Sequence, residues 1–275
     1  MVKTQLNSHG DEIIMTEITL QSESLDALAE TEVLVVENNG RDAQKVLNVY
    51  QAIKDDLGII YGLKLEETPT FKDNARDALD FLRDGDTTNV LPLAVIDRDL
   101  EYFEVLINED VIQAMERPSG SDRRDGVMFL SDVVYAHFQM EGYCRPIDVA
   151  AFYTAESTGV KEDSKFKDLS KYMATGKGPM IFVQQKGEDP TNEVGSLLEA
   201  GSIVHTVSKK GMFDEAPAPY EAADMRKTLA RMVADTNFVP SDFIGLYEEF
   251  NDFIRAEGKY NPSTIANAYD DFQAQ

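Results

Sequence analysis

The chain has little cysteine and no long apolar run, and each shortage excludes a class of protein. A single cysteine, Cys144, rules out an internal disulfide framework and a zinc site built from several cysteines. No stretch reaches the roughly 18 consecutive apolar residues of a membrane-spanning helix. The N-terminus also lacks a basic segment followed by an apolar run. We therefore expect a cytoplasmic protein that makes no contact with a membrane.

Basic residues are also scarce, since 26 lysines and arginines face 50 aspartates and glutamates, giving a formal net charge of −24. Binding to a phosphate backbone needs clustered cations, so nucleic acid is not an expected partner. The three histidines, His9, His137 and His205, lie in unrelated segments and have no metal-ligand spacing. The acidic surface is best explained as a solvated coat, with docking of a basic protein as the alternative.

The chain has 275 residues, 43% of them hydrophobic, which is enough to bury a sizeable core. Apolar runs predict strands at 33–36, 59–65, 92–96, 149–153 and 203–207. Apolar residues at helical spacing predict helices at 40–57, 74–82, 127–140, 193–200 and 219–233. A strand followed by a helix, repeated along the chain, predicts an α/β fold with a doubly wound, five-stranded parallel sheet.

The same pattern predicts how the chain is divided into parts. Residues 1–30 form an acidic N-terminal extension, and residues 31–237 form the α/β domain. The segments 100–124 and 156–193 exceed ordinary strand-to-helix connections, so we expect them to be insertions. Residues 238–275 form a C-terminal helical extension whose apolar stripe should pack on the domain or on a second chain.

Four predicted strands end in polar side chains. The strand ends are Glu37-Asn38, Asp97-Arg98-Asp99, Thr154 and Lys209. Ligands of parallel α/β sheets bind at the carboxyl ends of the strands, so these side chains should meet at one edge of the sheet. Carboxylates, a hydroxyl and a lysine are the groups needed for Mg²⁺-assisted phosphoryl transfer to a carboxylate.

Six segments resemble, in the right order, the receiver domain of two-component response regulators. They are Val35-Val36-Glu37-Asn38, Asp73–Leu79, Val95-Ile96-Asp97, Asp125–Leu130, Ala151–Ala155, and Glu199–Ser202 followed by Lys209. The resemblance implies a flavodoxin-like fold of the receiver type and a phosphorylation-controlled signalling switch rather than an enzyme. It also implies the partners: a histidine kinase or phosphotransfer protein, a protein that receives the output, and, as an assembly, a homodimer.

The resemblance further implies a role for each site residue. Asp97 is the phospho-acceptor, and Thr154 and Lys209 bind phosphoryl oxygens. The residues around a Mg²⁺ ion are Glu37, Asn38, Asp97 and Asp99. Asn38 stands where the family usually has a second acid, so the site loses a charge that a hard cation prefers.

Two alternatives stay open. Asn38, together with Lys210 in place of the proline that usually follows the family's lysine, favours a degenerate receiver that works as a phosphorylation-independent interaction module. Asp97 and Asp99 also have the nucleophile and acid/base spacing of haloacid-dehalogenase-like phosphatases. A phosphatase would use Thr154 and a downstream lysine as well, but it would leave Glu37 unexplained.

Overall fold

The computed structural model describes residues 3–6, 12–15, 30–61, 64–65, 68–100, 126–139, 143–210, 222–256 and 264–275. The chain divides into two units, Met1–Glu30 and Thr31–Gln275. In the first unit, β1 (Lys3–Leu6) pairs with β2 (Glu12–Met15) as an antiparallel hairpin. The short strands β3 (Glu30–Thr31) and β5 (Lys64–Leu65) lie outside the main sheet.

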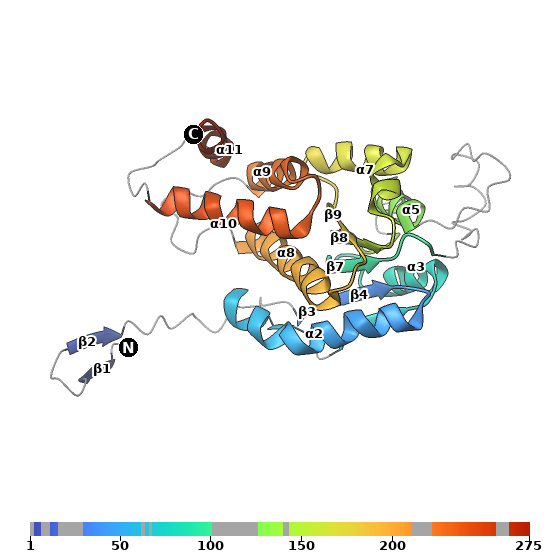
Figure 1. Cartoon of the computed structure of the whole chain (residues 1–275), viewed down its shortest axis with the longest axis horizontal. Coiled ribbons are helices and arrows are strands. Elements are labelled where there is room, and N and C mark those ends of the chain that lie inside the picture. The colour runs from blue at the N-terminus through green and yellow to red at the C-terminus, as the bar shows by residue number, and fades with distance from the viewer. Residues whose placement is uncertain are drawn as a thin grey trace. The chain divides into compact units, whose positions relative to one another are not determined.

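A five-stranded parallel sheet forms the centre of the second unit (Figure 1). In order across the sheet, its strands are β6 (Thr70–Lys72), β4 (Val33–Val36), β7 (Leu91–Ile96), β8 (Ile147–Thr154) and β9 (Met180–Gln185). Numbered along the chain, the order is 2-1-3-4-5, which is the flavodoxin-like arrangement. The predicted α/β class and the five-stranded parallel sheet are therefore confirmed.

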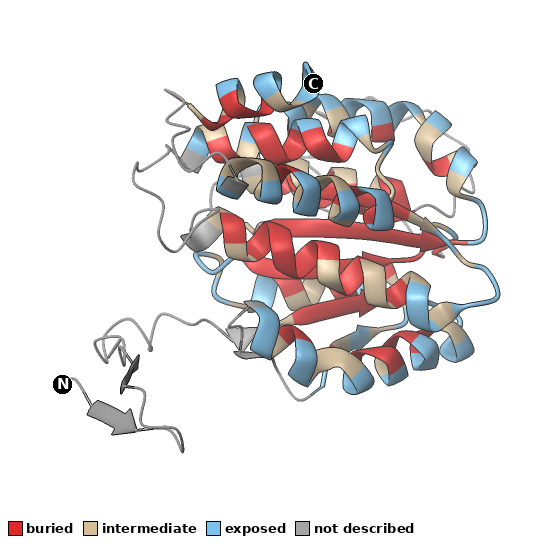
Figure 2. Ribbon diagram, turned by 60° about the vertical axis from the view of Figure 1, so that its left-hand side comes forward, coloured by how far each residue is buried: buried red, intermediate tan, exposed pale blue. Residues whose placement is uncertain are grey.

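Helices cover both faces of this sheet. On one face, α2 (Gly40–Tyr61) lies beside α8 (Pro190–Lys210). The other face carries α3 (Ala75–Asp84), α5 (Gly126–Gln139) and α7 (Ser164–Ala174), and the short α6 (Ser157–Glu162) precedes α7. Every residue of β4, β7 and β8 is buried, as Figure 2 shows, because the strands are covered from both sides. Among the described helices, none is both long and apolar enough to cross a membrane.

The predicted apolar stripe of the C-terminal segment packs within its own chain. Three helices follow α8, namely α9 (Ala222–Asp235), α10 (Pro240–Ala256) and α11 (Ile265–Gln273). The ring of Phe243 in α10 is fully buried, and its centroid lies 5.1 Å from the ring centroid of Phe182 in β9. Phe250, also fully buried, lies 5.3 Å from Tyr269 of α11. The C-terminal helices therefore extend the core of the sheet domain.

The turn between α9 and α10 covers part of the outer edge of β9. The backbone N–H of Val183 in β9 donates to the carbonyl of Phe238 at 2.8 Å. To present this carbonyl, Asn237 and Phe238 adopt positive φ angles of 52° and 66°, which are uncommon for residues other than glycine. The ring of Phe238 packs 5.0 Å from Phe166 of α7, and this contact offsets the backbone strain.

The predicted second strand at 59–65 is wrong as a strand of the main sheet, and only its last two residues form a strand, β5. Residues 59–61 are the last turn of α2, so Gly58 does not end that helix. Ile59 and Ile60 are 82% and 64% exposed, unlike residues of a buried strand. A short apolar run has no periodicity that separates strand from helix, and β6 forms the second strand instead.

The predicted fifth strand at 203–207 is wrong, because that segment belongs to α8. The helix predicted at 193–200 is present as part of α8, but it continues past Gly201 to Lys210. An added Cβ at Gly201 would lie 3.1 Å from Leu93, so this glycine lets α8 approach β7 closely and is not a helix end. Buried between the sheet, α2 and α10, α8 is apolar over much of its surface and resembles a strand in sequence.

The true fifth strand is β9, inside the segment predicted as the insertion 156–193. That segment also contains α6 and α7, so it supplies the helices and the strand that complete the sheet. The other expected insertion, 100–124, lies outside the described residues apart from Leu100. The remaining predicted strands and the helices at 74–82 and 127–140 are present, with Asn74 as the N-cap of α3.

Candidate functional site

Four neighbouring strands place a polar residue at the same edge of the sheet. Thr154 ends β8, while Glu37, Asp97 and Lys186 directly follow β4, β7 and β9. Glu37 N–H donates to the Lys72 carbonyl (3.0 Å), and Asp97 N–H donates to the Val36 carbonyl (2.9 Å). Lys186 N–H donates to the Thr154 carbonyl (2.7 Å). These bonds continue the backbone hydrogen bonding between neighbouring strands beyond the strand ends, so the site residues lie on a rigid backbone.

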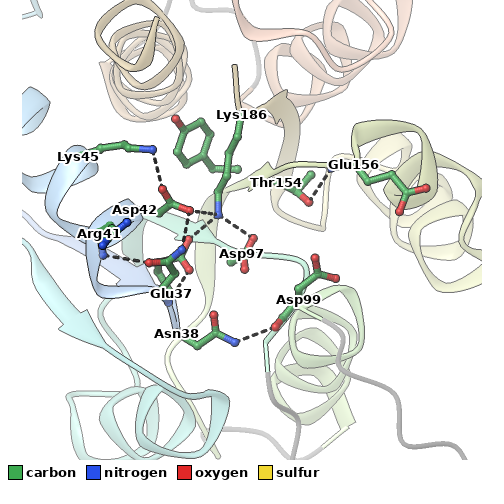
Figure 3. Close-up of polar contacts among 12 residues, drawn as sticks. Glu37, Asn38, Arg41, Asp42, Lys45, Asp97, Asp99, Thr154, Glu156 and Lys186 are labelled. Carbon is green, nitrogen blue, oxygen red and sulfur yellow. Dashed lines mark hydrogen bonds and ion pairs between the residues drawn. The ribbon is translucent and has the colours of Figure 1, made fainter. Parts of the chain in front are cut away.

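The ammonium group of Lys186 binds the carboxylates of this edge (Figure 3). Its Nζ donates to Glu37 Oε2 at 2.7 Å and to Asp97 Oδ1 at 3.1 Å. It also forms an ion pair with Asp42 Oδ2 at 3.2 Å, from the first turn of α2. Glu37 and Asp97 are buried, so three carboxylates converge on one largely enclosed cation.

Burial and charge act on these groups in opposite directions. Burial raises the pKa of Glu37 and of Asp97, and the bonds from Lys186 only partly offset this effect. Burial alone would lower the pKa of Lys186, but its hydrogen bonds to Glu37 and Asp97 raise that pKa overall. Burial opposes a low pKa at Asp42, yet the bonds from Lys45 and Lys186 lower it. The site is therefore an acidic cluster that depends on Lys186 for its charge balance.

Asn38 connects two loops of the site. Its Nδ2 donates to the backbone carbonyl of Asp99 at 2.8 Å, which joins the loop after β4 to the loop after β7. Next to it, the Asn39 N–H donates to Glu37 Oε1 at 2.8 Å and fixes the orientation of that carboxylate. The side chain of Asp99 is exposed at the rim.

Thr154 is completely buried at the end of β8, and its hydroxyl oxygen accepts a bond from the Glu156 N–H at 3.3 Å.

The start of α5 lies against the loop that carries Asp97. Gly126 begins α5 and donates its N–H to the Arg98 carbonyl at 2.7 Å. An added Cβ at Gly126 would lie 2.1 Å from the Asp97 carbonyl oxygen. Only glycine allows the start of α5 to approach the loop of Asp97 this closely.

The structure brings most of the predicted site residues to one edge, but it does not bring Lys209 there. Lys209 lies in the last turn of α8, a helix that starts after the carboxyl end of β9. At 1.5 Å per residue, Lys209 is roughly 30 Å along the helix from its first residue, near the opposite end of the sheet. Glu37 and Asp97 share one cation, Thr154 ends the next strand, and Asn38 contacts the backbone of Asp99.

Sequence reasoning missed Lys186 and Asp42. The signal for Lys186 was the apolar run Met180–Val183 followed by Gln-Gln-Lys-Gly, which has the form of the other strand ends. Its interpretation as part of an insertion hid that signal. No sequence signal pointed to Asp42, because the position of its carboxylate depends on how α2 starts relative to β4.

The carboxylate groups of the site are of the chemical type that binds a hard divalent cation. Glu37, Asp42 and Asp97 provide carboxylate oxygens, and Lys186, together with Lys45 at Asp42, leaves their combined charge negative. In the part of the chain that the structure describes, no group of three or more His, Cys, Asp or Glu side chains is arranged to hold a metal ion. Lys186 occupies the common space of these carboxylates, so a Mg²⁺ ion would have to share Glu37 and Asp97 with it.

Comparison with protein families finds no family model that matches this chain, and the curated proteins and solved structures yield no match either. Fold and site together define an α/β protein with a flavodoxin-like sheet and a lysine–carboxylate cluster at the carboxyl edge of that sheet.

Proposed function

We propose that this protein is a phosphorylation-controlled signalling switch of the receiver type, which accepts a phosphoryl group on Asp97. The observation that carries the proposal is the convergence of Glu37, Asp97, Thr154 and Lys186 from four adjacent strand ends. An acceptor carboxylate, a hydroxyl and an ammonium group are the parts that phosphoryl transfer to aspartate needs. Lys186 takes the role that the sequence suggested for Lys209.

In the proposed transfer, an oxygen of Asp97 attacks the phosphorus of the donor. A new O–P bond forms while the bond from phosphorus to the leaving group breaks, and the leaving group keeps the electron pair. Burial raises the pKa of Asp97, so its ionised form is a stronger base than an exposed aspartate. Lys186 and the Thr154 hydroxyl would bind oxygens of the transferred group.

The cofactor that we propose for this transfer is Mg²⁺. Glu37 and Asp97 would hold the ion, with Asn38 and Asp99 at its periphery, and bound Mg²⁺ would neutralise charge on the phosphoryl oxygens. The proposed partners are a histidine kinase or phosphotransfer protein as donor and a further protein that responds to the modified state.

The experiment is incubation with acetyl phosphate and Mg²⁺, read by intact mass. The wild type should gain the mass of one phosphoryl group, and Asp97→Asn should gain none. Asp168→Asn is the matched control, since it removes an exposed carboxylate of α7 outside the site and should still be labelled. Equal labelling of the wild type and Asp97→Asn would contradict the assignment.

The same assay separates the two candidate lysines. Lys186→Met removes the cation beside Asp97, so the labelling rate should fall on the order of 100-fold, as for loss of one electrostatic stabiliser. Lys209→Met changes a residue at the far end of α8 and should leave the rate within about twofold of wild type. The reverse result would restore Lys209 to the site and remove Lys186 from it.

One observation favours the degenerate receiver as a second candidate. Lys186 already binds Glu37, Asp42 and Asp97 together, which closes the acidic cluster around a cation of the protein itself. A wild type that gains no label from acetyl phosphate at any Mg²⁺ concentration would support this phosphorylation-independent interaction module.

The phosphatase alternative has less support. Among the described elements, no strand follows Lys186, whereas a phosphatase of that type needs a later strand that ends in metal-binding acids. The acidic pair Asp214-Glu215, which follows Lys209 in the sequence, lies outside the described residues.

A further inference from the structure

The segment that follows Lys186 is anchored by one carboxylate, that of Glu193 in the first turn of α8. Glu193 Oε2 accepts from the Gly187 N–H at 3.0 Å, and Oε1 accepts from the Asp189 N–H at 3.2 Å. The hydroxyl of Tyr153 donates to the same Oε2 at 2.9 Å. Three donors from two segments therefore meet at one side chain, directly after the lysine of the site.

Tyr153 connects this anchor to the ammonium group of Lys186. Lys186 Nζ lies 5.4 Å from the centroid of the Tyr153 ring, within the range of a cation–π contact. Tyr153 is nearly fully buried and precedes Thr154, so its ring is fixed by the strand that carries the hydroxyl of the site. Glu193 thus contacts both the backbone after Lys186 and the aromatic ring that Lys186 lies against.

The anchor also determines which residue follows Lys186. An added Cβ at Gly187 would lie 2.6 Å from Glu193 Oε1. A larger residue there would push the carboxylate away, so Gly187 and Glu193 form a matched pair.

Capping of α8 accounts for only one of these bonds, that from the Asp189 N–H, and the side chain of Asp189 provides the cap on the other side. Asp189 Oδ1 accepts from the Asn192 N–H at 3.2 Å, and Oδ2 accepts from Asn192 Nδ2 at 2.7 Å. The bonds from Gly187 and Tyr153 to Glu193 join parts of the chain outside α8.

We propose that Glu193 is a positioning residue, which holds Lys186 and Tyr153 so that the ammonium group stays beside Asp97 and can meet a phosphoryl oxygen there. This inference rests on the proposed function only in its last step. The placement of Lys186 is a property of the unmodified protein and can be measured without phosphorylation.

The test compares Glu193→Ala with Asp189→Ala, a variant that removes the helix cap at the same turn but leaves the three bonds to Glu193 in place. The first measurement is the NMR hydrogen-exchange rate of the Lys186 ammonium protons in the full-length protein. In Glu193→Ala, this exchange should become faster, because the ammonium group loses its fixed contacts with Glu37 and Asp97. In Asp189→Ala, the exchange rate should match the wild type.

The second measurement is the rate of labelling by acetyl phosphate. Glu193→Ala should label on the order of tenfold more slowly, and Asp189→Ala should label at the wild-type rate. Should Glu193→Ala fold poorly, Tyr153→Phe keeps the ring, removes one bond to Glu193, and should speed the exchange of the Lys186 ammonium protons in the same direction.

Unchanged exchange of the Lys186 ammonium protons in Glu193→Ala, or an equal change in Asp189→Ala, would overturn the inference. A wild type that is never labelled, together with ammonium exchange that responds to Glu193 alone, would refute the proposed function and leave the positioning role intact. The two proposals therefore fail in distinguishable ways.

Discussion

At the scale of single residues, two buried acids at opposite ends of the sheet behave in opposite ways. Asp148, near the start of β8, accepts a bond from His205 Nδ1 at 3.0 Å and pairs with Arg226. Although burial opposes it, these two partners lower the pKa of Asp148. At Asp97, burial prevails over Lys186 and raises the pKa. Ionised Asp148 therefore stabilises the fold, whereas ionised Asp97 destabilises it.

Asp148→Asn should lower the free energy of unfolding at neutral pH by about 3–5 kcal/mol, because Arg226 keeps its charge and loses its partner. The pKa of Asp148 is lower in the folded state than in the unfolded state, where it is about 4. Ionised Asp148 therefore stabilises the fold at pH values above about 4, and this stabilisation is lost as the pH falls through the pKa of the folded state. The wild type and the variant should therefore differ less in their free energy of unfolding, measured with urea, below about pH 4.

Asp97→Asn is the control for that measurement. A raised pKa means that the ionised carboxylate is unfavourable in the fold, so the amide should be no less stable than the wild type at neutral pH. A loss in Asp97→Asn equal to that in Asp148→Asn would show that the direction assigned to Asp97 is wrong.

At the scale of helices and strands, Gly126 and Gly195 should respond oppositely to alanine. Gly126→Ala forces a methyl group against the Asp97 carbonyl and should destabilise the protein by about 1–3 kcal/mol. Gly195 lies inside α8 with no atom within 4 Å of an added Cβ, so Gly195→Ala should stabilise by roughly 0.4–1 kcal/mol. Thermal unfolding of both variants is the measurement, and shifts of the same sign would contradict the close approach at Gly126.

The elements that sequence predicted correctly are those whose pattern admits one interpretation. β4, β7 and β8 are apolar runs with abrupt polar ends, and Asp97, Glu37 and Thr154 follow from them directly. α8 is covered on several sides, so its apolar stretch at 203–207 imitates a strand. That single error moved the predicted lysine from Lys186 to Lys209. The local sequence pattern cannot identify the fifth strand, because both β9 and 203–207 are apolar and the choice depends on which segment pairs with β8.

At the scale of the whole molecule, the C-terminal helices and the sheet share one hydrophobic core. Truncation after Pro240 would remove α10 and α11 and uncover the ring of Phe182 on β9. Stability should fall by more than the roughly 3–5 kcal/mol expected for loss of one buried phenylalanine ring, while the oligomeric state stays unchanged.

Thermal unfolding and size-exclusion chromatography with light scattering measure both properties. Phe243→Ala is the point-mutation control and should lose about 3–5 kcal/mol by itself. Conversion of an oligomer into a monomer without loss of stability would show that the helices serve assembly instead.

The turn at Asn237 and Phe238 also has a consequence for aggregation. A strand edge with free N–H groups can add strands from other chains without limit when both edges of a sheet are open. Here the Phe238 carbonyl accepts a hydrogen bond from one backbone N–H of β9, that of Val183, and α9 and α10 pack along that strand. In the described part of the chain, β6 is the outer strand on the other side and has no strand partner beyond β4. Edge-to-edge pairing through β6 would join two copies and stop, so we expect the strained turn to limit growth into fibrils.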